Sequence, residues 1–172
     1  MQAFLEKEIR NDNSLVGEGV RVPSMKFALV MQLAHIQRHL LSEGVGMRQV
    51  IDYYFLLKSD ASNQRDDVFY KLKSFGLNHM AGALMWLLHV VLGLEEEYLI
   101  APMDEKRGRM LLRAIMEGGN FGHHYFDGKD TGVLGKIYAN HKKRLQLLRF
   151  DFKEAICNEV YSFYCFFAKM KK

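Results

Sequence analysis

Residues 35–57, HIQRHLLSEGVGMRQVIDYYFLL, decide the fold because a glycine break here separates two apolar patterns. Both patterns have the spacing of three and four residues that is typical of an α-helix with one buried side. Since glycine commonly ends a helix, the sequence predicts two helices that meet at residues 44–46, either as an antiparallel pair or at a sharp corner. The apolar residues are Phe27, Val30, Met31, Ala34 and Leu41 before the break, and Met47, Val50, Ile51, Tyr54 and Phe55 after it.

The polar residues of this stretch gather near the glycine break. With a rotation of about 100° per residue, His35, Arg38 and His39 fall in one sector of the first helix. On the second helix, Arg48 and Asp52 are four residues apart and share a face. They are either an ordinary exposed helix pair or, because this helix is apolar on two sides, a pair that is partly buried. It would then be either an architectural ion pair or a guanidinium that faces a phosphate.

Apolar spacing predicts further helices along the chain. The segment 77–94, LNHMAGALMWLLHVVLGL, is apolar on almost every side and is expected to be the central core helix. No segment alternates convincingly between apolar and polar positions, so the predicted fold is all-α, with six or seven helices packed around this one. The other helices are expected at residues 24–43, 47–58, 64–75, 104–117, 133–149 and 151–170, and the last two are either separate or one long bent helix.

Composition limits the class of protein. The chain has 172 residues, of which 49% are apolar, and this length fits one domain with a core of its own. We expect a lead-in or linker at residues 1–22 and a single helical domain at residues 23–172. The net charge of +4 permits a phosphate-bearing ligand, but it does not indicate a specific nucleic-acid binder.

Cysteine usage and hydropathy predict a cytoplasmic protein. Cys157 and Cys165 would be separated by about 12 Å along a helix, which is too far for a disulfide between them. Both are therefore expected to be reduced core residues. The apolar segment 77–94 contains Asn78, His79 and His89, which argue against a membrane span.

The run VPSMKFALVMQLAHIQRHLLSEGVGMRQVIDYYFLL resembles the second half of a family of bacterial nucleotidyltransferase-like proteins, often described as uncharacterised nucleotidyltransferases. In that family a VPS lead-in precedes a histidine-bearing helix and then a G-x-G-[LM]-R-Q-x-x-D helix. A later run, LEEEYLIAPMDEKRGRMLLRAIMEGGNFG at residues 94–122, also resembles the family. The matching residues of the first run are Val22, Pro23, Ser24, His35, His39, Gly44, Gly46, Met47, Arg48, Gln49 and Asp52.

The resemblance implies the helical carboxy-terminal part of such a protein without its catalytic half. The family's catalytic residues belong to an amino-terminal polymerase-β-like domain with a Gly-Ser turn and an Asp-x-Asp pair. Neither motif occurs in the 172 residues, so we assign no catalytic residue. Mg²⁺ and an NTP are expected only if a catalytic half is supplied elsewhere. The candidate ligand-cleft residues are His35, Arg38, His39, Arg48, Gln49 and Asp52.

Two other groups of residues are candidates for binding. His35 and His39 have the spacing of two metal ligands, and Asp52, His123 or His124 would have to supply a third. Histidines on a polar helix face are more often partners for backbone or carboxylate, so we assign no metal site. Cations at helical spacing near residue 109 form either a phosphate-binding face or an ordinary solvated face. They are Lys106, Arg109 and Arg113.

A competing hypothesis is a helical interaction or dimerisation module that does not catalyse a reaction. The carboxy-terminal segment has more aromatic residues than one helical stripe can hold. They are expected to pack in the core, or to contact a catalytic-domain partner or a second copy of the chain. The aromatic residues are Tyr161, Phe163, Tyr164, Phe166 and Phe167.

Overall fold

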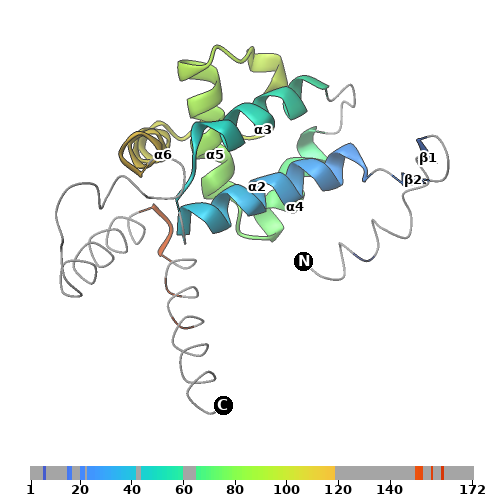
Figure 1. The fold of residues 1–172 in the computed structure, drawn as a ribbon, viewed down its shortest axis with the longest axis horizontal. Coiled ribbons are helices and arrows are strands. Elements are labelled where there is room, and N and C mark those ends of the chain that lie inside the picture. The colour runs from blue at the N-terminus through green and yellow to red at the C-terminus, as the bar shows by residue number, and fades with distance from the viewer. Residues whose placement is uncertain are drawn as a thin grey trace.

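The computed structural model of the protein describes residues 6, 15–16, 20–21, 23–41, 44–59, 65–118, 150–152, 156 and 160. Within these ranges the chain forms five α-helices and one short hairpin (Figure 1). The all-α prediction is confirmed. The helices are α2 (Met25–Leu41), α3 (Met47–Ser59), α4 (Arg65–Ser74), α5 (Asn78–Trp86) and α6 (Glu105–Gly118). The strands β1 (Leu15–Val16) and β2 (Val20–Arg21) pair antiparallel.

Two short helical turns complete the described part of the chain. A π-helical turn, η1 (Leu87–Val91), continues α5, and a 3-10 turn, η2 (Glu96–Tyr98), precedes α6. The helix predicted at residues 133–149 and most of the one at 151–170 lie outside the described residues, as do Cys157 and Cys165. The total of six or seven helices therefore stays a prediction.

Glycines end two of the helices where the sequence predicts it. Gly76 has a φ of 73°, a left-handed conformation that glycine adopts without strain. The backbone N–H of Leu77 then donates to the carbonyl of Leu72 at 2.8 Å, and both side chains are buried. This is the hydrogen bond of a Schellman motif with its apolar contact. Gly93, with a φ of 70°, follows η1 in the same way.

Helices α2 and α3 lie alongside each other and run in opposite directions in Figure 1, so the antiparallel alternative is correct. The chain turns at Gly44, whose φ is 107°. Between the helices, the buried hydroxyl of Tyr53 donates to the carbonyl of Leu29 at 3.2 Å. The buried side chains include Leu29, Leu33 and Ile36 of α2, and Val50, Tyr53 and Leu57 of α3.

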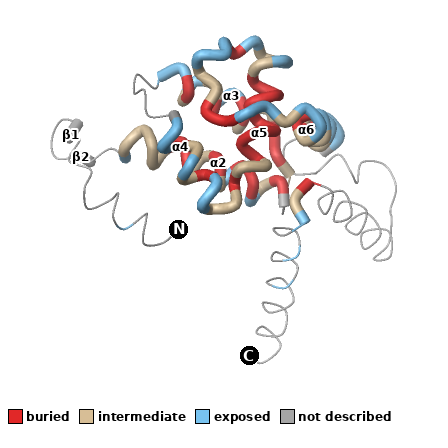
Figure 2. The backbone as a smooth tube through the Cα atoms, turned by 180° about the vertical axis from the view of Figure 1, so that it is seen from behind, coloured by how far each residue is buried: buried red, intermediate tan, exposed pale blue. Residues whose placement is uncertain are grey.

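Helix α5 is the central apolar helix, as predicted. Residues 80–86 are all buried, and α5 contacts α2, α4 and α6. In Figure 2 this helix forms a buried strip inside the domain. Burial ends within η1, where Val90 and Val91 are exposed. Among the described residues, no helix is long and apolar enough to cross a membrane.

Two glycines allow α5 and α6 to approach closely. The backbone N–H of Asp104 donates to the carbonyl of Gly82 at 3.0 Å, directly before α6 begins. A Cβ atom on Gly108 of α6 would lie 2.6 Å from Cδ2 of Trp86, inside the space of the indole ring. Side chains larger than hydrogen at these positions would therefore push the two helices apart.

Ion pairs connect elements that are distant in the sequence. Lys26 of α2 pairs with Asp67 of α4. The ammonium of Lys58 on α3 lies 2.9 Å from a carboxylate oxygen of Glu95, and 5.4 and 5.7 Å from the ring centroids of Tyr54 and Tyr98. Lys58 thereby ties the segment around η2 to the end of α3 through one ion pair and two cation–π contacts.

Candidate functional site

The two histidines of α2 contact each other. The Nε2 atoms of His35 and His39 are 3.0 Å apart, and the rings meet edge to face with centroids 4.3 Å apart. At this distance one Nε2 donates a hydrogen bond and the other accepts it. The predicted shared face of the two histidines is therefore confirmed.

A metal site at these histidines would need a third ligand. Within residues 23–41, 44–59 and 65–118 no three His, Cys, Asp or Glu side chains are grouped closely enough to hold a metal ion. Asp52 therefore does not complete a site with His35 and His39. His123 and His124 lie outside the described residues, together with the glycine-rich segment that contains them.

Arg48 and Asp52 lie on the exposed side of α3. Of the two alternatives, partial burial is wrong and exposure is correct, because Val50, Tyr53 and Leu57 form the buried side of this helix. The ion pairs found among the described side chains do not include one between Arg48 and Asp52. Both charged groups face solvent.

Gln49 has a clear architectural role. Its Oε1 atom accepts a hydrogen bond of 3.0 Å from the backbone N–H of Gly46, the residue before α3. A glutamine at the third helical position that reaches back in this way satisfies a free donor at the helix start. Gln49 was predicted as a ligand-cleft residue, and its side-chain oxygen is already used for capping.

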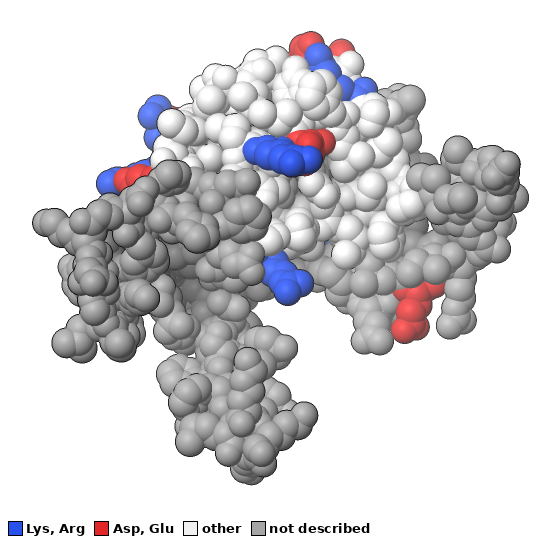
Figure 3. All heavy atoms as spheres, in the orientation of Figure 1, with Lys and Arg blue, Asp and Glu red and all other residues white. Residues whose placement is uncertain are grey.

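The cations of α6 are exposed but mostly paired within the helix. Arg109 contacts Glu105 at 2.9 Å, and Arg113 contacts Glu117 at 2.5 Å, each over four residues. Lys106 shares their exposed side. The structure thus brings the three predicted phosphate-binding cations to one face, but acidic neighbours offset two of them. The face drawn in Figure 3 likewise shows basic side chains scattered among acidic ones.

Sequence reasoning missed a second Asp/Arg pair, at the start of α6. The two carboxylate oxygens of Asp104 accept from the backbone N–H of Arg107 at 3.0 Å and from its guanidinium at 2.7 Å. The guanidinium also donates to the carbonyl of Phe150 at 2.7 Å. The sequence predicts a helix that begins at residue 104, but the spacing alone does not reveal the pair with Arg107.

The pKa of Asp104 reflects these contacts. Partial burial alone would raise the pKa of the carboxyl, but hydrogen bonds from the backbone and guanidinium of Arg107, with the positive charge of that guanidinium, hold it below its ordinary value. Asp104 is therefore ionised at neutral pH.

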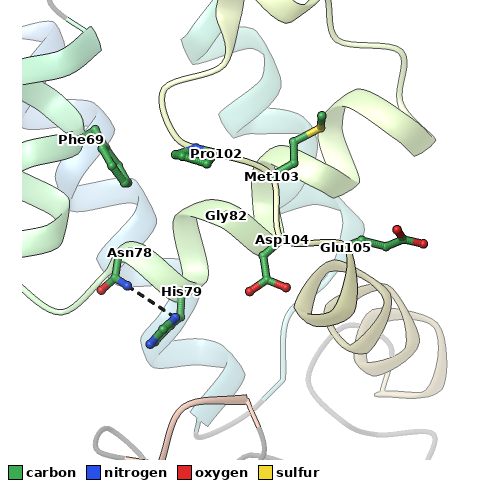
Figure 4. Close-up of a pocket in the computed structure, with 8 residues that line it drawn as sticks. All are labelled: Phe69, Asn78, His79, Gly82, Pro102, Met103, Asp104 and Glu105. Atoms are coloured by element: carbon green, nitrogen blue, oxygen red, sulfur yellow. Dashed lines mark hydrogen bonds between the residues drawn. The ribbon is translucent and has the colours of Figure 1, made fainter.

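Asp104 also lines an open pocket of about 410 Å³ (Figure 4). The pocket lies between α4, the first turns of α5 and the segment that leads into α6. None of the predicted site residues contributes to it. Its lining consists of Phe69, Asn78, His79, Gly82, Pro102, Met103, Asp104 and Glu105.

Residues 2–93 match the protein family described as uncharacterised nucleotidyltransferase. This match spans more than half of the 172 residues and includes α2 to α5 with η1. It ends before α6, so the resemblance of residues 94–122 lies outside it. No curated protein and no solved structure matches the chain. The polar residues around the α2–α3 turn are thus inside the matched region, and Asp104 is outside it.

Proposed function

The chain belongs to the uncharacterised nucleotidyltransferase family, and we propose that it supplies the helical, substrate-binding part of a nucleotidyl-transfer reaction. In this proposal the polypeptide does not catalyse the transfer by itself. Its 172 residues contain no Gly-Ser dipeptide and no Asp-x-Asp pair. The described residues also offer no group of three ligands that fits a metal ion, so we derive no step through Mg²⁺. The carboxylates for metal-assisted chemistry would come from elsewhere.

The exposure of Arg48 is the observation that carries this proposal. Arg48 lies on the outer side of α3, next to the glycine turn, and in the described part of the chain it takes part in no ion pair. A guanidinium in this state keeps its donors for the oxygens of a phosphate. His35, Arg38 and His39 lie near the other side of the same turn. In this proposal these side chains and Arg48 make up a polar, cation-bearing ligand surface near the turn.

A second candidate function is a protein-interaction module. Phe55 and Ile51 of α3 are 63% and 39% exposed, one helical turn apart on the outer side of the helix that carries Arg48. Exposed apolar side chains of this size suit a contact with another protein better than a contact with a nucleotide. The aromatic residues at 161–167, which the sequence assigned to the same role, lie outside the described residues.

A thermal-shift series tests the nucleotide proposal. The purified full chain would be melted with ATP, CTP, GTP, UTP and dTTP, each with and without Mg²⁺. A nucleotide at 100 times its dissociation constant adds about 2.7 kcal/mol to the free energy of unfolding. We expect a higher Tm with at least one nucleotide, loss of this shift in Arg48→Ala, and an unchanged shift in Lys73→Ala. Lys73 is an exposed cation on α4 and serves as the matched control.

Two results would contradict the proposal. One is the absence of a shift with every nucleotide. The other is a shift that Arg48→Ala and Lys73→Ala retain equally. If Arg48→Ala instead lowers the Tm of the free protein while ligand binding is unchanged, the turn is architectural and the interaction-module hypothesis is favoured.

A further inference from the structure

The pocket beside α5 has a polar side and an apolar side. In Figure 4 the carboxylate of Asp104 and the side chains of Asn78 and His79 occupy one side, and Phe69 and Pro102 lie opposite. The Glu105 carboxylate points away from the pocket in this view, and it pairs with Arg109 at 2.9 Å. Asp104 is therefore the acidic group that a bound molecule would meet.

Hydrogen bonds already present determine which polar atoms remain for a ligand. The amide nitrogen of Asn78 lies 3.4 Å from Nδ1 of His79, and an amide nitrogen can only donate. The Asn78 oxygen consequently stays available as an acceptor. Asp104 uses one lone pair of each oxygen for Arg107 and retains further acceptor capacity. The polar side of the pocket thus presents the oxygens of Asp104 and Asn78 as acceptors, beside the Nε2–H of His79 and the second amide hydrogen of Asn78 as donors.

No cationic Lys or Arg side chain lines the pocket. Arg107 and Arg109, which pair with its two acidic residues, are not among the lining residues of this described site. A phosphate or carboxylate would therefore meet an ionised carboxylate without a Lys or Arg in direct contact. A positively charged ligand would meet Asp104 and, on the other side, the ring of Phe69.

Gly82 fixes the position of Asp104 at the pocket. The carbonyl of Gly82 accepts the Asp104 backbone N–H, and a Cβ on Gly82 would lie 2.9 Å from the carbonyl oxygen of Pro102 and 3.1 Å from Cβ of Asp104. The missing side chain lets the segment before α6 lie directly on α5. The acceptors are thus held by the backbone of two helices rather than by a free loop.

We propose that this pocket binds a small organic amine, with its ammonium group at Asp104 and the Asn78 oxygen and its carbon skeleton against Phe69 and Pro102. An ammonium group has donors only, which suits the Asp104 carboxylate and the Asn78 oxygen, and its bond to a carboxylate is charge-assisted. The volume of about 410 Å³ accommodates a small ligand. A metal ion fits less well, because the described residues contain no group of three metal ligands. This site does not depend on the nucleotidyl-transfer proposal.

The test compares ligands of one shape and different charge on the full chain. Phenethylamine, 2-phenylethanol and 3-phenylpropionate would be titrated in turn, with the Asn78 and Gly82 amide signals followed by NMR. We expect saturable shifts with phenethylamine only. Its affinity should fall about tenfold or more in Asp104→Asn, because the charge-assisted contact is lost. Asparagine still caps a helix, so this variant is expected to fold.

Two further variants keep the test decisive. Glu105→Gln removes the same charge from the neighbouring residue, whose carboxylate faces away, and should change the affinity by less than about twofold. Asn78→Ala should weaken phenethylamine binding even if Asp104→Asn folds poorly. Equal binding of 2-phenylethanol would overturn the proposal, as would absence of phenethylamine binding or equal losses in Asp104→Asn and Glu105→Gln.

Discussion

The domain contains two Asp/Arg pairs on helices, and the structure treats them differently. Asp104 and Arg107 form two hydrogen bonds at the start of α6, and each side chain is 27% exposed. Arg48 and Asp52 of α3 are both exposed and form no ion pair with each other. The first pair connects the start of α6 to the carbonyl of Phe150, whereas both charged side chains of the second pair are exposed to solvent.

The two pairs therefore differ in how much the fold depends on them. Asp104 satisfies a free backbone donor of α6 and lies on Gly82, so its replacement disturbs the contact between two helices. Arg48 can be replaced without exposing an unsatisfied partner. In α6 the charged pair also caps the helix, whereas the pair of α3 caps no helix and is exposed, as the proposed contact with a ligand requires.

The largest expected effect is on the α5–α6 contact that supports the first pair. Gly108→Ala places a methyl group within the space of the Trp86 ring, which would have to move. Overpacking of this kind costs about 1–3 kcal/mol. We expect the largest loss of this series in the free energy of unfolding, measured by urea denaturation. Lys106→Ala, at an exposed position of the same helix, should change it by less than about 0.5 kcal/mol.

Asp104→Ala is expected to have the next largest effect. The variant removes the cap of α6 and leaves the Arg107 guanidinium without its carboxylate, at a cost of about 1–2 kcal/mol. Asp104→Asn retains a capping oxygen, so its free energy of unfolding should decrease less than that of Asp104→Ala. A loss for Asp104→Ala no greater than that for Asp52→Ala would remove the contrast between the two pairs.

Tyr53→Phe tests the interior of the α2–α3 pair. The buried hydroxyl donates to the Leu29 carbonyl, and its removal should cost about 0.5–1.5 kcal/mol. Burial also raises the pKa of the Tyr53 phenol well above its ordinary value. Stability from this group is therefore complete below the pKa of the unfolded phenol, about 10, and decreases as pH rises above it. Between pH 9 and pH 11 the free energy of unfolding should fall less in Tyr53→Phe than in the wild type. An identical dependence on pH in the two proteins would contradict the assignment.

The smallest expected effect is the change in stability of the Asp104→Asn variant at low pH. Because the pKa of Asp104 is lower in the folded protein, its contribution to stability is present above the pKa of an unfolded aspartate, about 3.9. It is lost as pH falls through the folded pKa. Asp104→Asn should therefore lose less stability between pH 6 and pH 3 than wild type does. An equal loss in Asp104→Asn and wild type would contradict this assignment.

Much of the fold is predictable from the sequence, because apolar spacing and glycines act locally. The helices on both sides of Gly44, the stops at Gly76 and Gly93 and the central helix α5 all follow from such signals. The shared face of His35 and His39 follows from their spacing alone.

The remaining features depend on contacts between distant elements. Apolar residues on two sides of α3 suggested burial of Arg48 and Asp52, yet Phe55 and Ile51 on the same helix are exposed. Periodicity does not show which apolar side meets the core. Nor does it show that Gly108 lies against Trp86, or that Gly82 brings Asp104 to a pocket, since each requires the relative position of α5 and α6.

The most direct test of the central claim is a pair of double-mutant cycles measured by urea denaturation. One cycle uses Asp104→Ala and Arg107→Ala, and the other uses Arg48→Ala and Asp52→Ala. We predict a coupling of about 1 kcal/mol or more for the first pair, and of less than about 0.5 kcal/mol for the second. A coupling between Arg48 and Asp52 as large as that between Asp104 and Arg107 would contradict the account, because Arg48 would then be architectural rather than available for a phosphate.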